Sequence, residues 1–219
     1  PQGRPVLFQA GSSGRGQQFA VSHADVIFAI QPDLARMQTF MAQIRAAGKA
    51  NKRRDPVRVT FAIQPFIGET LAGAEAKRDA MLARIPLEAA LTRISGTFGI
   101  DLDTVDIDLP LQEISTQASQ GLVSAMSSMF GDKNITLREA VRLSGLAGMI
   151  PQILGTPEDV ADQLEEIWRQ TGCHGFNLTP AIVPGGYEEF VDQVVPLLQQ
   201  RGIFRTEYEA DTLRGNMID

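Results

Sequence analysis

The first thirty residues place a short apolar strand, a turn of glycine and serine, a helix start and a second apolar strand in immediate succession. We expect the strands at Val6–Gln9 and Asp25–Ile30, with the turn at residues 11–16. The backbone N–H groups of such a turn point in one direction, and the dipole of the following helix adds partial positive charge, so together they favour a bound phosphate. Glycine-rich turns between a strand and a helix also occur without a ligand, and the pattern alone leaves both interpretations open.

The candidate phosphate site consists of six consecutive residues: Gly11, Ser12, Ser13, Gly14, Arg15 and Gly16. The glycines permit positive φ angles and a close approach of a ligand to the main chain. The two serine hydroxyls can donate hydrogen bonds to phosphate oxygens. The guanidinium of Arg15 could hold a phosphate through two N–H groups, or it could lie in solvent.

Apolar strands alternate with amphipathic helices along the chain, which indicates parallel βα units. Each predicted strand is nearly continuous in apolar residues, as expected for a strand covered on both faces. The four predicted strands are Val6–Gln9, Asp25–Ile30, Val57–Ile67 and Gly175–Leu178. Four such units make half of an eight-stranded barrel, and a complete barrel takes about 250 residues. The sequence therefore predicts an α/β fold, half of a TIM-type barrel, in a single partial domain over residues 1–219.

Helix boundaries are marked by capping residues. One helix is expected to end at Gly48, and another to begin after the N-cap Thr156 and to end at Gly172. A last helix over residues 187–200 is expected to bend at Pro196, which cannot donate a backbone hydrogen bond. The helix after Thr156 is expected to bury four side chains: Val160, Leu164, Ile167 and Trp168.

The periodicity breaks down between residues 96 and 150. Residues 99–109 alternate apolar and acidic positions, like a small edge strand with a solvated acidic face, and residues 121–130 are apolar with small residues. A segment of this kind between scaffold units is an active-site cover or a disordered loop, and the pattern alone leaves both open. Met126 and Met129 could line a substrate passage, although a small core contact explains them more simply.

The run from Val6 to Ala20, followed by residues 23–28, resembles the bacterial luciferase-like flavin monooxygenases. It is most similar to the branch that oxidises nitrilotriacetate, EDTA and dibenzothiophene sulfone. Residues 153–161 and 172–178 are similar to that family's closing segments. The matches occur in order along nearly the whole chain, which begins at Pro1 without a methionine. We therefore expect the chain to be the C-terminal half of the family's barrel.

The resemblance implies a two-component flavoprotein reaction. In that family, reduced FMN from a separate flavin reductase reacts with O₂ to give a flavin hydroperoxide, which oxidises a small organic substrate. Gly11, Ser12 and Ser13 match the family's phosphate-binding turn, and residues 14–16 continue it. The family's insertions lie over the flavin, which supports a lid at residues 96–150. Its catalytic residues lie on earlier strands, so we expect none in this chain and no activity from this fragment alone.

Other classes of function are disfavoured by composition. A net charge of −6 argues against a nucleic-acid partner, and no apolar run approaches the roughly 20 residues of a membrane span. His23 and His174 have no ligand residues at metal-binding spacing, so we expect no metal site. Cys173 is the single cysteine, which favours a reducing, cytoplasmic location, and we expect the adjacent Cys173 and His174 not to be catalytic.

A noncatalytic half-barrel module that assembles with another chain is the alternative function. Half a barrel has two open edges of parallel sheet, and such edges pair readily with other chains. We therefore expect association with the missing N-terminal half of the barrel, and also homo-oligomers.

Overall fold

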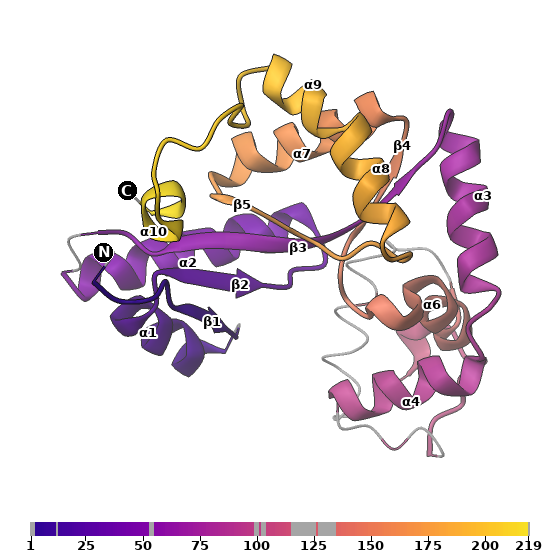
Figure 1. Cartoon of the computed structure of the whole chain (residues 1–219). Coiled ribbons are helices and arrows are strands. Elements are labelled where there is room, and N and C mark those ends of the chain that lie inside the picture. Colours follow the sequence, from indigo (N-terminus) through magenta and orange to yellow (C-terminus); the bar gives the residue numbers. More distant parts are fainter. Residues whose placement is uncertain are drawn as a thin grey trace.

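The computed structural model describes residues 3–11, 13–52, 55–98, 101, 104–114, 126 and 135–218. Its centre is a five-stranded sheet in which every pairing is parallel (Figure 1). The strands are β1 (Phe8–Ala10), β2 (Val26–Ala29), β3 (Arg58–Ile67), β4 (Gln152–Gly155) and β5 (Gly175–Leu178). The predicted α/β fold with a parallel sheet is thus confirmed.

Strand β3 is the longest strand and pairs with three others. Its residues 58–61 pair with β2, residues 60–63 with β5 and residues 64–67 with β4. The amides of Arg58 and Gln64 donate to the chain before β2 and β4, whereas the carbonyls of Val59 and Ile63 accept from the chain beside β5. The backbone N–H and C=O groups of successive residues in a strand point to opposite edges of that strand. Residues 58 and 64 are an even number of positions apart, so β2 and β4 both lie along the same edge of β3. Strand β4 lies beyond the carboxyl end of β2.

Four strands lie where the sequence predicts them, and β5 has the predicted bounds. The strand β4 is an addition that the sequence analysis did not predict. Only four residues long, it follows Pro151 directly, so its apolar signal is too brief to separate from the surrounding loop.

Helices flank the sheet and continue into a separate group beyond it (Figure 1). They are α1 (Gly14–His23), α2 (Leu34–Ala50), α3 (Leu71–Leu82), α4 (Leu87–Phe98), α6 (Leu137–Ser144), α7 (Pro157–Thr171), α8 (Gly185–Gln193), α9 (Val195–Gln200) and α10 (Leu213–Met217). Two short 3₁₀ helices lie at Leu111–Glu113 and Gly145–Ala147. Among the described residues, none of the helices combines the length and apolar character that crossing a membrane requires.

The cap predictions are confirmed for α7 and wrong for α2. The Oγ1 of Thr156 accepts from the Asp159 amide at 3.1 Å, and Gly172 ends α7 with a φ of 64°. Helix α2 instead continues through Gly48, which keeps helical geometry, and ends at Ala50 with Asn51 as its C-cap. The left-handed residue at this end of the helix is Lys52, with a φ of 51°, and not Gly48, so the glycine does not mark the end.

The break at Pro196 is confirmed, because α8 ends at Gln193 and α9 begins at Val195. The expected burial of Trp168 is wrong, since 40% of this residue is exposed. Val160 and Leu164 are buried and Ile167 is partly buried. Trp168 lies about 100° further around the helix than Ile167, beyond the stripe that faces the sheet.

Three hydrophobic clusters hold the chain together. One packs α1 and α2 against β2 and β3, and another packs α7, α8 and α9 against β3 and β4. The second cluster in chain order belongs to the segment between β3 and β4, and its buried members are Ala90, Ile94, Leu111, Ile114, Met126, Leu137, Ala140 and Val141. We call the part of the chain from α3 to α6 the insertion lobe; this cluster is the core of its part after α3, whereas α3 itself packs against β3 and β4.

The predicted edge strand at residues 99–109 is not found among the described residues of that segment. Asp101 and residues 104–109 are irregular, with a turn at residues 107–108, and a single bridge joins Pro110 to Thr136. The carboxylate of Asp106 accepts from the Asp108 amide at 3.0 Å, and this local bond competes with strand pairing. Met126 is fully buried in the lobe core, as the simpler interpretation predicted, and Met129 lies outside the described residues.

Candidate phosphate-binding site

The predicted phosphate turn lies between the carboxyl end of β1 and the start of α1. Gly11 has a φ of 147°, a conformation that residues with a side chain rarely adopt, and a Cβ there would lie 3.3 Å from Nε2 of Gln9. Glycine is therefore required at position 11 for the chain to turn away from the strand. Ser12 lies outside the described residues, so its predicted role stays a prediction.

Ser13 is the N-cap of α1. Its Oγ accepts from the Gly16 amide at 3.1 Å, and its carbonyl accepts from the Gln17 amide at 2.8 Å. The hydroxyl oxygen is thus used as an acceptor within the turn, while the hydroxyl hydrogen can still donate to a ligand. Capping is a role that the sequence analysis did not assign to Ser13.

Two backbone N–H groups at the start of α1 are available to a ligand. The amides of Gly14 and Arg15 donate to no described acceptor, as is usual for the first turn of a helix. A Cβ at Gly14 would meet nothing within 4 Å, whereas a Cβ at Gly16 would lie 3.2 Å from the Oγ of Ser13. The turn therefore leaves space for a ligand next to Gly14, whereas Gly16 is closely packed against Ser13.

The Arg15 side chain is exposed and forms no ion pair with any described residue. It can extend toward an anion at the turn or remain in solvent, so both alternatives of the sequence analysis stay open. Together with the helix dipole, a guanidinium at this position makes the turn electrostatically favourable for a phosphate.

Gln9, at the end of β1, was missed by the sequence analysis. Its Nε2 donates to the Ala10 carbonyl at 2.7 Å, whereas its Oε1 is buried without a partner among the described residues. Leaving a buried acceptor unpaired costs about 1–3 kcal/mol. A donor from a ligand or from another part of the protein would remove this cost, and the position beside Gly11 places Gln9 next to the turn. A lone glutamine in a strand carries no sequence signal for such a role.

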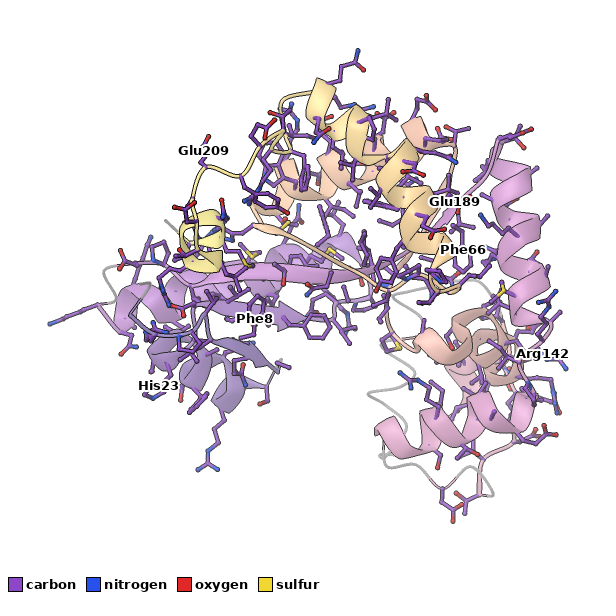
Figure 2. All side chains as sticks on the ribbon, in the orientation of Figure 1. Phe8, His23, Phe66, Arg142, Glu189 and Glu209 are labelled. Carbon is purple, nitrogen blue, oxygen red and sulfur yellow. The ribbon has the colours of Figure 1, made fainter. Side chains whose placement is uncertain are left out.

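No described strand pairs with the outer edge of β1, beside the turn. Among the described residues β1 pairs with β2 alone, and β5 at the opposite edge pairs with β3 alone. Four large apolar side chains near β1 are 39–57% exposed: Leu7, Phe8, Phe19 and Ile30. Figure 2 shows Phe8 and His23 at this end of the molecule, where the His23 ring lies 4.9 Å from that of Phe19.

The other residues considered for chemistry are buried or structural. Burial raises the pKa of the Cys173 thiol, which keeps it in the protonated, unreactive form, and burial lowers the pKa of His174. The Nδ1 of His174 accepts from the Val59 amide at 3.0 Å, which joins β5 to β3. Within the part of the chain that the structure describes, no three His, Cys, Asp or Glu residues come together as a metal site.

A buried carboxylate, also missed by the sequence analysis, lies at the opposite end of the sheet. Asp25 is 4% exposed and accepts hydrogen bonds from Arg4, the Leu7 amide and Arg214. Burial alone would raise the pKa of Asp25, but these bonds outweigh it and hold the pKa well below its usual range. Because Asp25 precedes β2, it joins both ends of the chain at the amino ends of the strands, where barrels keep residues for stability.

Comparisons with known proteins agree with the resemblance. The sequence profile of the luciferase-like monooxygenase family matches residues 1–175. The chain is 37% identical to dibenzothiophene-sulfone monooxygenase from Rhodococcus erythropolis, over 99% of this chain and 49% of the relative. It is 36% identical to nitrilotriacetate monooxygenase component A from Aminobacter aminovorans, again over 99% and 49%. The chain therefore spans about half the length of the curated relatives it matches.

The structural comparison gives the same result. The crystal structure of DmoA from Hyphomicrobium sulfonivorans superposes with a TM-score of 0.92 and 34% identity, over 100% of this chain and 46% of that one. The long-chain alkane monooxygenase LadA gives a TM-score of 0.79 and 29% identity, over 97% and 45%. These neighbours confirm the predicted α/β fold and show that the chain corresponds to about half of a TIM-type barrel protein. The chain belongs to the luciferase-like monooxygenase family.

Proposed function

We propose that the chain is the C-terminal part of an FMN-dependent monooxygenase that oxidises a small organic substrate with O₂ and receives reduced FMN from a separate flavin reductase. Family membership supports the reaction class. The observation that carries the cofactor assignment is the pair of available N–H groups, from Gly14 and Arg15, at the start of the ten-residue helix α1. The proposed phosphate site keeps all six residues 11–16.

The residues of the turn fit a phosphate in three respects. The two amides can donate directly, the Ser13 hydroxyl retains its hydrogen for a further bond, and Gly14 leaves the approach free of any side chain. Each hydrogen bond to a charged group contributes about 1.5–3 kcal/mol. When bound, reduced FMN supplies the electrons for oxygen activation. The task of the turn is to hold the phosphate and so fix the position of the cofactor.

The insertion lobe supports the proposal that residues 96–150 are an active-site lid. Helix α3 starts four residues after the end of β3, so the lobe begins at the carboxyl ends of the strands, where barrel enzymes place their active sites. The turn at residues 11–16 follows the carboxyl end of β1 and lies at the same end of the sheet. A lobe in this position can exclude water from a bound cofactor.

The absent barrel half is part of the proposal. The uncovered edges of β1 and β5 fit an N-terminal half that closes the barrel and supplies the catalytic residues, so we propose no turnover from residues 1–219 alone. A second candidate, a noncatalytic half barrel that pairs with another chain, rests on the same two edges and on the exposed apolar side chains beside β1. We also propose that the protein forms homo-oligomers, because open sheet edges pair with other chains, and that it is cytoplasmic, because a single cysteine favours a reducing compartment.

Titration of FMN and riboflavin tests the phosphate site. We expect the protein with a complete barrel to bind FMN at least tenfold more tightly than riboflavin, because one hydrogen bond to a charged phosphate accounts for about a factor of ten. Residues 1–219 alone should bind both ligands weakly, since they offer the phosphate site without the rest of the cofactor site. Equal affinity of the complete protein for the two ligands would remove the basis of the assignment.

A further inference from the structure

A cavity lies at the carboxyl ends of β3 and β5, between α3 and α8. It encloses about 330 Å³, near the lower end of the 300–1,000 Å³ range of small-molecule sites. Its walls are mainly apolar and include Pro65, Phe66, Met81, Pro180, Ala181 and Ile182. The phosphate turn does not border it, and nothing in the proposed flavin site uses it.

One ion pair provides the charged groups in the wall of this cavity. The Nζ of Lys77 on α3 donates to Oε1 and Oε2 of Glu189 on α8 at 2.5 and 2.6 Å, and to the Ile67 carbonyl at 3.1 Å. An ammonium group has three N–H donors, so these three contacts use all of them. Lys77 therefore cannot bind an anion in the cavity without giving up a protein partner.

Glu189 keeps hydrogen-bonding capacity for a ligand. Each carboxylate oxygen can accept two hydrogen bonds, and each accepts one from Lys77. The Glu189 side chain is 26% exposed and borders the cavity together with Phe66; both residues are labelled in Figure 2. A neutral hydroxyl or amide N–H can thus donate to Glu189 while the apolar part of the molecule contacts Phe66 and Met81.

We propose that this cavity is a binding site for a small, uncharged organic molecule that carries one hydrogen-bond donor. An anion would lose its water next to a carboxylate and a saturated ammonium, without gaining a partner. A neutral molecule keeps the Lys77–Glu189 pair intact and buries apolar surface. The proposal goes beyond the flavin site and does not depend on it, because described residues of this chain form the cavity and binding requires no cofactor.

Three naphthalene derivatives of similar size test the ligand class on the 219-residue chain without flavin. Isothermal titration calorimetry should show binding of 2-naphthol, binding of 2-methoxynaphthalene that is about tenfold weaker because it lacks a donor, and no measurable binding of 2-naphthoate. Binding of 2-naphthoate as tight as that of 2-naphthol would overturn the proposal, as would equal binding of 2-naphthol and 2-methoxynaphthalene.

A pair of matched substitutions locates the binding. Gly185 borders the cavity, and a Cβ there meets nothing within 4 Å, so Gly185→Leu places a side chain in open space without an initial clash. We expect this variant to weaken 2-naphthol binding at least tenfold. Gly48→Leu is the control, since Gly48 also has open space around a Cβ but lies on α2, away from the cavity. Undiminished binding by Gly185→Leu, or an equal loss in both variants, would contradict the assignment.

Glu189→Gln tests the role of the charge. This variant removes the carboxylate that pairs with Lys77 and frees part of the ammonium for a ligand. The preference should therefore shift by about tenfold from 2-naphthol toward 2-naphthoate. An unchanged ratio of the two affinities would show that the ion pair does not select the ligand and would contradict the proposed ligand class. The Gly185→Leu variant tests separately whether the ligand binds in this cavity.

Discussion

The amide of Gly16 donates a 3.1 Å hydrogen bond to the Oγ of Ser13, so the side chain proposed to meet a phosphate also caps helix α1. The two roles use different parts of one hydroxyl group. The oxygen accepts from the helix, and the hydrogen is left for the ligand. Substitutions that keep one role and remove the other can therefore separate helix capping from phosphate binding.

We expect Ser13→Ala to lower both stability and FMN affinity in a protein with a complete barrel. Loss of the cap should cost about 1 kcal/mol of unfolding free energy, and loss of the donor should weaken FMN binding about tenfold. Ser13→Asp should keep the cap, because aspartate is a good N-cap residue, but it should weaken FMN binding further by repulsion. Chemical denaturation and FMN titration measure the two effects. FMN affinity that is unchanged in Ser13→Asp would contradict the phosphate role.

Replacement of Arg15 by Gln distinguishes its two alternatives. If the guanidinium holds the phosphate, Arg15→Gln weakens FMN binding in the complete protein and leaves riboflavin binding unchanged. Arg36→Gln serves as the control, because Arg36 lies on α2 and pairs locally with Asp33 at 3.7 Å. Equal FMN affinity of both variants and the original protein would assign Arg15 to solvent.

Asp25 should make stability sensitive to acid. The pKa of Asp25 in the folded protein lies below the value near 3.9 of the unfolded chain. The contribution of Asp25 to the free energy of unfolding is therefore fully present above about pH 4 and is lost as the pH falls toward the folded pKa. Asp25→Asn should cost about 3 kcal/mol at neutral pH, because it leaves Arg4 and Arg214 without their buried partner. It should also flatten the loss of stability below pH 4.

Urea denaturation between pH 2 and pH 7 measures the effect of Asp25. The exposed carboxylate of Asp108, which pairs with Arg138 at 2.6 Å, provides the control. Asp108→Asn should leave stability at neutral pH nearly unchanged, since exposed ion pairs contribute little. A comparable change in both variants would mean that Asp25 does not hold the two chain ends together.

Gly68 fixes the position of α3 against the sheet. A Cβ at this residue would lie 2.5 Å from the Ala74 amide nitrogen and 2.9 Å from the Gly73 carbonyl carbon, and neither backbone atom can move independently. Gly68→Ala should therefore destabilise the protein by about 1–3 kcal/mol. Gly48→Ala, in the open part of α2, should instead stabilise it by about 0.5–1 kcal/mol. Equal melting temperatures for both variants would show that α3 does not pack closely on Gly68.

The open edge of β1 should drive association of the isolated chain. Phe8 and Phe19 are 50% and 57% exposed beside this edge, so we expect dimers or larger assemblies by light scattering. Phe8→Glu combined with Phe19→Glu should shift the population toward monomers. Tyr208→Glu, a change at a 79% exposed residue of the C-terminal segment, should have no such effect. A compact monomer of the original chain would contradict this expectation.

The sequence predicted features that local chemistry determines. The apolar run of β5 and the capping residues Thr156 and Gly172 of α7 lie where predicted, because neighbouring residues fix them. Gly48 does not end α2, because the left-handed residue there is Lys52, and Trp168 is exposed because it lies beside the helix stripe that faces the sheet. Of the six residues in the proposed phosphate turn, the five that the structure describes form one strand-to-helix junction, as expected.

The features that were missed depend on contacts between distant parts of the chain. Asp25 lies 189 residues from Arg214, and Lys77 lies 112 residues from Glu189. No local pattern links such partners, since an isolated charged residue looks the same whether it is solvated or paired. The unpaired Oε1 of Gln9 is likewise visible only once the turn beside it is built.

The pairing of β4 with the last residues of β3 places the two ends of the insertion lobe side by side. The chain leaves the sheet at Gly68 and returns at Gln152, and the Gly68 amide donates to the Gly155 carbonyl at 3.0 Å. The chain between Gly68 and Gln152 thus leaves the sheet and returns to nearly the same position on β3. Lengthening or replacing the part between α3 and β4 changes mainly the entropy of loop closure, which grows only slowly with length. The architecture thus permits the segment between α3 and β4 to vary in length and sequence while the strand register of the sheet stays the same.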